Sequence, residues 1–424
     1  MPSWYQDAKL GIRICWGPYS LSRGEPSTVI AEHWGRRGHY DDLARNFRQM
    51  LRDWDPSGAL GAIATSGARY LVVSAKHHDG FALWPARTKN SRKRGWQVPR
   101  DVVGELTEGA RALGLKVGLS YSSGLDWTFG GAPLDGPAEL AAAIPRTRSY
   151  AAYVDAQLRE LISRYAPSIL WNDVGSPPAQ DILALLTDYY ETVPDGVVND
   201  RFGQPEAEER GVEKLRIAGA VRRLFAPRTM RPTVRAGAKL PFRHADFRTV
   251  DSGASFPDGE GPWECMRSLD DADEGPASNL VHQLCDVTAH GGNLLLGIGP
   301  NADGSMDAPQ AARLHGLGSW LKLNGEAIFG TRPWGEREGV TEDGIDLRFT
   351  SKGMTTYAIL LGTPADRTIV LPGLRLLPYA GLRVLGSISY STWFQEGKDI
   401  HVRLTEPLRE SPAHVISITP QPRA

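Results

Sequence analysis

Between about residues 10 and 330, short apolar runs alternate with longer amphipathic stretches, and this alternation constrains the fold more than any other feature. Residues 70–74 (YLVVS) form one such run, which is apolar enough for a strand that is buried on both faces. Residues 150–165 keep apolar side chains on one helical face, and Pro167 ends that stretch. Repeated strand and helix segments predict parallel strands with crossover helices, arranged as an open doubly wound sheet or as a closed barrel.

An open dinucleotide-binding sheet should carry a glycine-rich turn after an early strand. The nearest candidate, residues 297–299 (GIG), lies late in the chain, lacks the GxGxxG spacing and is followed by Pro300. We therefore predict an α/β chain with a (β/α)-barrel catalytic domain over residues 1–334. Its strands are expected at residues 10–14, 70–74, 116–121, 169–171, 196–198 and 293–296.

After residue 334 the pattern changes to short runs with period-two alternation, separated by Gly, Pro and Asp turns. These runs carry no helical stripe of apolar residues. The pattern predicts a small antiparallel β-sandwich domain over residues 335–424.

Residues 204–243 fit neither pattern, because they are strongly basic. Between Arg210 and Arg243 there are ten Lys and Arg residues, and Glu213 is the only acid. We interpret the segment as an insertion loop. It is either a solvated surface excursion or a lid that favours an anionic or extended group beside the site.

Charge and cysteine content exclude several classes of partner. The 48 Lys and Arg residues balance 49 Asp and Glu residues, so no field of one sign is available to hold nucleic acid or an anionic membrane. The three cysteines have no CxxC spacing, which favours a reducing compartment. No segment approaches the roughly 20 apolar residues of a membrane span, and no basic region followed by an apolar stretch opens the chain. We expect a cytoplasmic enzyme, and homo-oligomerisation stays open.

Candidate functional residues follow the predicted strands directly, where a barrel gathers its loops at one face. Five strand ends are rich in His, Trp, Tyr, Asp, Asn and Arg: residues 15–19 (CWGPY), 76–81 (KHHDGF), 121–127 (YSSGLDW), 171–175 (WNDVG) and 199–203 (NDRFG). Aromatic faces stack on sugar C–H surfaces, and the polar groups donate to hydroxyls. A central carboxylate can stabilise an oxocarbenium ion. The composition therefore predicts a carbohydrate site.

Other readings of these residues compete with this one. His77 and His78 suggest a metal, but adjacent strand residues point to opposite sides and no HxH or HExxH motif accompanies them. We expect one histidine to meet the substrate and the other to pack against or hydrogen-bond a neighbouring loop. We expect that neither metal nor cofactor is needed. Trp16, Trp127 and Trp171 could be core aromatics. Asp173 lies beside an aromatic residue, which allows its pKa to be tuned as glycosidases require.

In order along the chain, these stretches resemble the signatures of the α-L-fucosidase family of retaining glycoside hydrolases. The resemblance runs from about Trp4 to Trp334 and is carried by residues 11–19, 75–84, 121–127, 170–173, 198–201, 291–296 and 320–328. It implies that Asp173 attacks the anomeric carbon and forms a glycosyl-enzyme ester. It also implies that His77, His78, Tyr121, Trp171 and Arg201 surround the sugar ring, and Trp16 and Glu32 match more loosely.

The sequence departs from the family at the acid/base. In the branch that it resembles, a Glu follows an Asp-Phe-basic-Thr stretch, whereas here residues 246–250 (DFRTV) lead into Asp251. Asp reaches about 1.5 Å less far, and retaining chemistry needs the two carboxyl groups about 5–5.5 Å apart. Asp251 is our candidate and Glu264 its competitor. Glu32, or no acid/base at all, are the remaining alternatives.

The second departure is Cys15, where the family usually has a His that bonds a ring hydroxyl. A thiol is a weak donor and acceptor, so we expect altered recognition at one ring hydroxyl. The alternative is that a water or a nearby side chain takes the place of the His. Three hypotheses follow: an exo-α-glycosidase acting on terminal α-L-fucosides, the same machinery acting on another glycone such as a related deoxysugar, and a catalytically silent sugar-binding protein.

Overall fold

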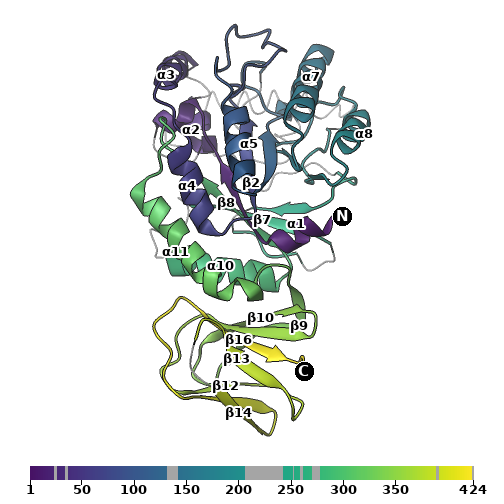
Figure 1. Cartoon of the computed structure of the whole chain (residues 1–424). Helices are drawn as coiled ribbons and strands as arrows, with labels where there is room; N and C mark the ends of the chain where they lie inside the picture. Colours follow the sequence, from purple (N-terminus) through teal and green to yellow (C-terminus); the bar gives the residue numbers. More distant parts are fainter. Residues whose placement is uncertain are drawn as a thin grey trace, which may run out of the picture.

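The computed structural model describes the 424-residue chain except residues 23–25, 34–36, 131–141, 206–241, 252, 258–260, 270–276, 388–390 and 423–424. The basic segment predicted as an insertion therefore lies almost wholly outside the described residues. Within the described part, no helix combines the length and the apolar character that crossing a bilayer requires. Figure 1 shows two units, a larger one of strands and helices and a smaller one of strands alone.

The larger unit is built on eight parallel strands in the order β5-β4-β3-β2-β1-β8-β7-β6. A parallel bridge between Asn199 and Phe247 joins the two edge strands, so the sheet curls into a barrel. This confirms the predicted barrel, although β6 and β7 were not predicted, because neither is a continuous apolar run. The strands are β1 (Leu10–Ile14), β2 (Tyr70–Lys76), β3 (Lys116–Tyr121), β4 (Ile169–Asn172), β5 (Val197–Val198), β6 (Arg248–Val250), β7 (Trp263–Ser268) and β8 (Asn293–Ile298).

Helices cover the outer face of these strands (Figure 1). Several begin where the sequence supplies a capping side chain: Asp101 accepts a hydrogen bond from the amide of Gly104, and Thr147 does so from that of Tyr150. The helices are α1 (Ser3–Ala8), η1 (Pro18–Leu21), α2 (Pro26–His33), α3 (Arg37–Met50), α4 (Ser57–Ser66), α5 (Val102–Ala112), α7 (Arg148–Tyr165), α8 (Ile182–Thr192), α10 (Ala277–Ala289), α11 (Ala308–Asn324) and η2 (Gly325–Ala327).

Alternate strand residues separate two cores. Ile12 and Ile14 of β1 belong to the large core between the strands and the helices. A smaller core fills the barrel itself, and it includes Tyr5 of α1, Tyr70 and Trp171. Arg13 lies between two outward residues, so the period-two rule places it inside the barrel.

The smaller unit is an antiparallel sandwich with a five-stranded sheet, β13-β16-β11-β10-β9, and a three-stranded sheet, β12-β15-β14. The strands β9 and β14 were not predicted, because they are largely exposed and lack clear alternation. The strands are β9 (Arg332–Val340), β10 (Asp346–Lys352), β11 (Thr355–Leu360), β12 (Thr368–Leu371), β13 (Gly381–Val384), β14 (Ser391–Glu396), β15 (Asp399–Leu404) and β16 (His414–Thr419).

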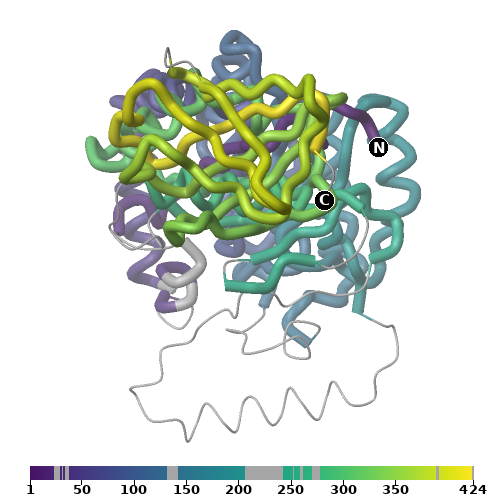
Figure 2. Tube along the Cα trace, turned by 90° about the horizontal axis from the view of Figure 1, so that it is seen from below, coloured from purple at the N-terminus to yellow at the C-terminus, as the bar shows by residue number. Residues whose placement is uncertain are grey.

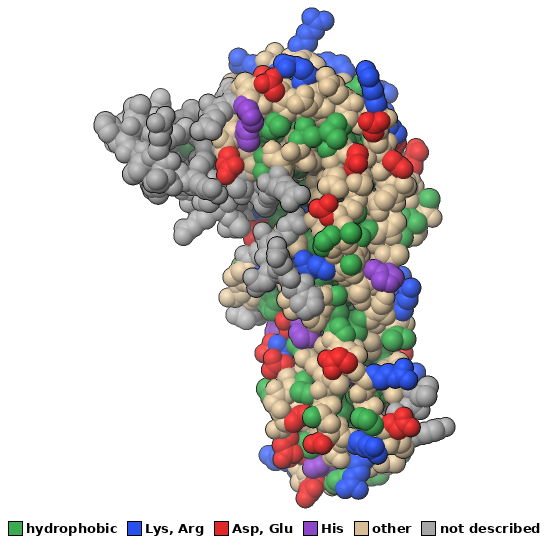
Figure 3. Space-filling model, turned by 90° about the vertical axis from the view of Figure 1, so that its left-hand side faces the viewer, with side chains coloured by type: hydrophobic (Ala, Val, Ile, Leu, Met, Phe, Trp, Pro, Cys, Tyr) green, Lys and Arg blue, Asp and Glu red, His purple; other side chains and the backbone are tan. Residues whose placement is uncertain are grey.

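The two units pack through α10 and α11, which lie at the level where they meet (Figure 1). The indole of Trp320 on α11 donates to the carbonyl of Ala413, 2.9 Å away, and Tyr357 and Val415 of the sandwich belong to the large core. Viewed from below, the sandwich covers that end of the barrel unit (Figure 2). On the face drawn in Figure 3, basic and acidic side chains are interspersed, in keeping with the balanced net charge.

Candidate active site

Asp173 is the first residue after β4, at the end of the barrel where the strands have their carboxyl termini. Its amide donates to the carbonyl of Tyr121 at 3.0 Å. The preceding Asn172 exchanges two hydrogen bonds with Asn199 at the end of β5, at 3.0 and 2.8 Å. The side-chain amide of Asn172 also donates to the carbonyl of Arg201 at 2.7 Å. Two neighbouring strand ends are thereby locked together, and they fix the backbone that carries Asp173.

Arg13 is the nearest charged partner of Asp173, and the sequence analysis missed it. Its Nη2 donates to Oδ2 of Asp173 at 3.1 Å, and its side chain is 4 % exposed. The same nitrogen lies 3.3 Å from the hydroxyl of Ser120, and the guanidinium stacks 4.5 Å from the ring centre of Trp171. A signal was present, because a charged residue in the middle of a buried strand (LGIRI) needs a partner.

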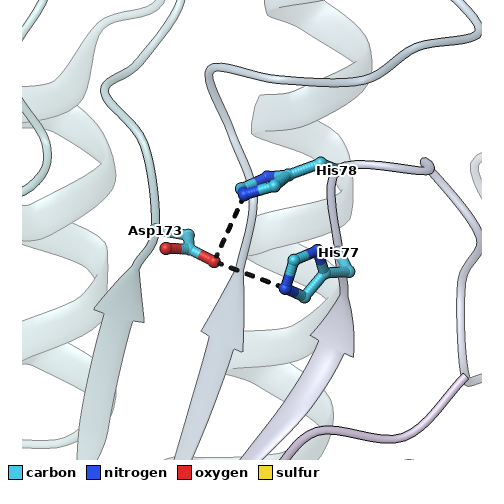
Figure 4. A group of neighbouring side chains, drawn as sticks. All are labelled: His77, His78 and Asp173. Atoms are coloured by element: carbon cyan, nitrogen blue, oxygen red, sulfur yellow. Dashed lines mark ion pairs between the residues drawn. The ribbon is translucent and has the colours of Figure 1, made fainter. Parts of the chain in front are cut away.

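Both histidines turn toward the same carboxylate oxygen, as Figure 4 shows. Their Nε2 atoms lie 3.9 Å (His77) and 4.0 Å (His78) from Oδ2 of Asp173. His78 also meets the expectation that one histidine bonds a neighbouring loop, because its Nδ1 lies 2.7 Å from the hydroxyl of Ser122, directly after β3; what the pattern did not predict is that both rings face Asp173. The reason is that β2 ends at Lys76, with a register shift against β3, so the alternation of strand faces does not extend to the pair.

The turn that carries the histidines depends on a glycine. Gly80 has a φ of +72°, and a Cβ atom there would lie 2.3 Å from Oδ1 of Asp126. Asp126 in turn forms a fully buried ion pair with Lys76 at 3.1 Å. The hydroxyl of Ser122 lies 2.7 Å from Nδ1 of His78 and orients that ring. The close packing at Gly80 thus shapes the turn, and the bond to Ser122 orients the ring of His78.

The charges around Asp173 favour its ionised form. Burial alone would raise the pKa of Asp173, but the positive charge of Arg13 opposes this, with smaller contributions from His78, His77 and Arg201. The pKa of Asp173 is therefore well below its ordinary value. Burial lowers the pKa of both histidines, so at neutral pH they are uncharged and Arg13 dominates.

Arg201 joins Asp173 to the predicted acid/base. Its Nη2 forms an ion pair with Oδ1 of Asp251, and its Nη1 lies 3.5 Å from the carbonyl oxygen of Asp173. Its Nε donates to the hydroxyl of Thr249 at 2.8 Å. The other carboxylate oxygen of Asp251 is buried and has no hydrogen-bond partner among the described residues. We call Arg13, His77, His78, Asp173, Arg201 and Asp251 the mouth cluster.

Glu264 lies at the opposite end of the barrel interior. Its side chain is 0 % exposed, and its two oxygens accept hydrogen bonds from Tyr70 (2.6 Å), Tyr5 (3.1 Å) and the indole of Trp171 (2.9 Å). Burial raises the pKa of Glu264 above its ordinary value, although these three donors oppose the shift. We call Tyr5, Tyr70, Trp171 and Glu264 the floor cluster. Trp171 thus lies between the two clusters, in contact with Arg13 of the mouth cluster and Glu264 of the floor cluster. Glu264 is therefore separated from Asp173 and Asp251.

Two further predicted residues, Trp16 and Tyr121, point away from the mouth cluster. Trp16 packs on Phe47 and Trp54 in the large core, with ring centres 4.3 and 3.9 Å apart. The side chain of Tyr121 points to the helix layer, where its hydroxyl donates a hydrogen bond to Gln157 of α7 at 2.7 Å. The structure therefore does not support a sugar contact for either ring. Glu32 is exposed on α2.

Cys15 directly follows β1 and is partly buried. The hydroxyl of Ser74 lies 3.8 Å from its sulfur, which is a weak hydrogen bond. The substitution of His by Cys thus leaves a small, weakly polar side chain beside Arg13, two residues earlier on the same strand.

The donor atoms of His77, His78 and Asp173 lie within 4.8 Å of one another, a spacing that could suit a metal ion. The carboxylate oxygen that faces both imidazoles is, however, the one that already pairs with Arg13. A divalent cation there would stand beside a buried guanidinium, which opposes its binding electrostatically. The prediction that the site needs neither metal nor cofactor stays a prediction.

Comparisons with known proteins agree on one family. A family model described as alpha-L-fucosidase matches residues 1–326. The chain is 30 % identical to the plasma alpha-L-fucosidase of Rattus norvegicus over 88 % of its own length and 80 % of the relative's, and 28 % identical to the tissue alpha-L-fucosidase of Homo sapiens over 88 % and 78 %. A crystal structure of Thermotoga maritima alpha-fucosidase in complex with fucose is 31 % identical, covers 99 % of this chain and 97 % of that one, and has a TM-score of 0.78.

Proposed function

This chain belongs to the alpha-L-fucosidase family of glycoside hydrolases, and on that premise we propose that it hydrolyses terminal α-L-fucosides with retention at the anomeric carbon. In this proposal Asp173 is the nucleophile and Asp251 the general acid/base. The observation that carries it is the ionised carboxylate of Asp173 at the barrel mouth, paired with Arg13 and faced by two neutral imidazoles. Such a carboxylate can attack a sugar, while the imidazoles bond its hydroxyls.

The reaction proceeds in two balanced steps. First, a carboxylate oxygen of Asp173 bonds to the anomeric carbon, the bond from that carbon to the aglycone oxygen breaks, and Asp251 protonates the departing oxygen. Then Asp251 takes a proton from water as the water oxygen attacks the same carbon, and Asp173 leaves as a carboxylate. The two inversions give net retention.

Asp251 is better placed for the proton transfers than Glu264. One oxygen of Asp251 stays with Arg201, and the second lacks a hydrogen-bond partner in the described part of the chain, so it can carry the proton. Glu264 is enclosed by three donors in the floor cluster and would lose all of them on moving to a leaving group. Because Asp251 is also present in the mouth cluster, a catalytically silent sugar-binding protein is the weaker hypothesis.

The test replaces the nucleophile. We expect Asp173→Gly and Asp173→Ala to lower kcat for an aryl α-L-fucoside by about 10⁴-fold or more. Azide should restore part of the activity in the glycine variant and give β-L-fucosyl azide, because it enters from the vacated side. The matched control is Asp195→Ala, an exposed carboxylate paired with Lys116, which should keep wild-type activity.

Two further readouts separate the rival hypotheses. In the wild-type enzyme, nuclear magnetic resonance should show the α anomer of fucose as the first product. A panel of aryl glycosides tests whether another glycone is turned over faster. Unchanged turnover by the Asp173 variants, or a β anomer as the first product, would overturn the proposal.

A further inference from the structure

We infer that Arg13 is a positioning residue that holds one oxygen of the nucleophile. Its charge raises the activation barrier of ester formation and lowers that of ester hydrolysis. The inference rests on the proposed role of Asp173. It concerns a residue on β1 that points into the barrel and to which the sequence analysis gave no role.

The carboxylate of Asp173 has two unequal oxygens. Oδ2 takes the hydrogen bond from Arg13 and is the oxygen that faces both histidines. The second oxygen points away from both imidazoles in Figure 4. Arg13 therefore fixes the rotation of the carboxylate and leaves Oδ1 as the attacking atom.

Burying the charged guanidinium of Arg13 costs free energy unless a partner compensates the charge. Its side chain is 4 % exposed, and its Nε has no hydrogen-bond partner among the described residues. It also contacts a methionine sulfur (Met266, 3.2 Å), a hydroxyl (Ser120, 3.3 Å) and the face of Trp171. Asp173 is the one carboxylate that it pairs with in the described structure. Because a buried ion pair can usually be replaced by apolar residues without loss of stability, stability alone does not account for this arginine.

The charge of Arg13 acts oppositely on the two steps. A carboxylate stabilised by a cation is a weaker nucleophile, so the pair slows formation of the ester. It is also a better leaving group, so the pair speeds hydrolysis of the ester. When C1 bonds to Oδ1, Asp173 becomes neutral and Arg13 is left buried without an anion, which disfavours accumulation of the intermediate.

Removal of the charge should make the second step rate-limiting. Arg13→Met keeps a similar volume without the charge, and Arg13→Lys keeps the charge without the planar fork. With an aryl α-L-fucoside that has an activated leaving group, Arg13→Met should show a burst of released phenol, with kcat and KM both lowered. An enzyme trapped by a 2-fluoro-fucoside should reactivate at least about tenfold more slowly than the wild type. Arg13→Lys should recover part of that rate.

A pH profile supplies the readout that a packing role would not move. Without the guanidinium, the acid limb of kcat/KM should shift upward by about one pH unit or more, because the nucleophile of the free enzyme protonates more readily. Arg313→Met, which alters a half-buried arginine on α11, should leave both the burst and the profile unchanged. Circular dichroism checks folding, and Arg13→Gln serves as the neutral variant if the methionine variant does not fold.

The possible results separate the role of Arg13 from the nucleophile role of Asp173. Loss of activity in Asp173→Gly together with wild-type reactivation and acid limb in the neutral Arg13 variants would overturn the role of Arg13 alone. Persistent turnover in Asp173→Gly would remove the nucleophile assignment itself. A slower reactivation that lysine partly restores supports the inference.

Discussion

Asp173 and Glu264 are both buried carboxylates of the same barrel, linked through Trp171, but their partners differ in kind. Asp173 in the mouth cluster faces the guanidinium of Arg13, and its pKa is lowered. Glu264 in the floor cluster faces two phenol hydroxyls and an indole, and its pKa is raised. Burial acts in the same direction on both acids. The cation that pairs directly with Asp173, and not burial, therefore accounts for the opposite directions of the two pKa shifts.

The contrast also separates two uses of a buried acid. In the floor cluster Glu264 accepts hydrogen bonds from three neutral donors, and it thereby joins α1, β2, β4 and β7. In the mouth cluster Arg13 pairs with one oxygen of Asp173, and the second oxygen is left for the substrate at the end of the barrel where the loops gather. We therefore expect substitutions at the mouth to change catalysis and substitutions at the floor to change stability.

The largest expected effect concerns which acid serves the leaving group. In Asp251→Ala, kcat/KM should fall about 10³-fold for a fucoside with a poor leaving group such as an alcohol, but less than about tenfold for a dinitrophenyl fucoside, which needs no proton. Glu264→Gln should change both substrates equally and by less than about tenfold. A loss that is selective for poor leaving groups in the Glu264 variant would contradict the division.

The second effect is on stability. Glu264→Ala leaves the hydroxyls of Tyr5 and Tyr70 and the indole of Trp171 without their acceptor, so the free energy of unfolding should fall by about 3 kcal/mol or more. Urea denaturation measures it. The matched control is Asp42→Ala, an exposed partner of Arg45, which should cost less than about 1 kcal/mol. Equal losses in the two variants would show that the floor cluster is not a special element of the core.

The smallest effect is a pH dependence with a defined sign. Because the pKa of Glu264 is raised in the folded protein, the unfolded chain releases this proton first as the pH rises above about 4.3. The wild type should therefore lose stability relative to Glu264→Gln as the pH rises through this window, by at most about 1.4 kcal/mol per pH unit. Denaturation of both proteins at a series of pH values gives the difference. A difference that grows in favour of the wild type would contradict the raised pKa.

Much of the fold follows from the sequence, because burial of both faces leaves apolar runs such as residues 70–74. The short strand β6 was not predicted by this argument, since three residues carry no periodicity. The position of Asp173 was predictable because strand ends meet at one face of a barrel. Its geometry fits the predicted nucleophile, a role that stays a prediction.

What could not be predicted is the direction of side chains around strand ends. His77 and His78 lie beyond the last residue of β2, where alternation has stopped, and both turn inward. Tyr121 is still within β3 and keeps the outward face that its parity gives it. Arg13 was overlooked because its partner is 160 residues away in the chain. Short-range pattern carries no information on such a pair.

The floor cluster has a consequence for how the polypeptide is assembled. Tyr5 bonds to Glu264, 259 positions later, and its carbonyl accepts from the side chain of Asn293. The helix α1 therefore cannot take its final place until most of the barrel has been synthesised. A substitution in α1 would accordingly act late in folding, when this end of the barrel closes.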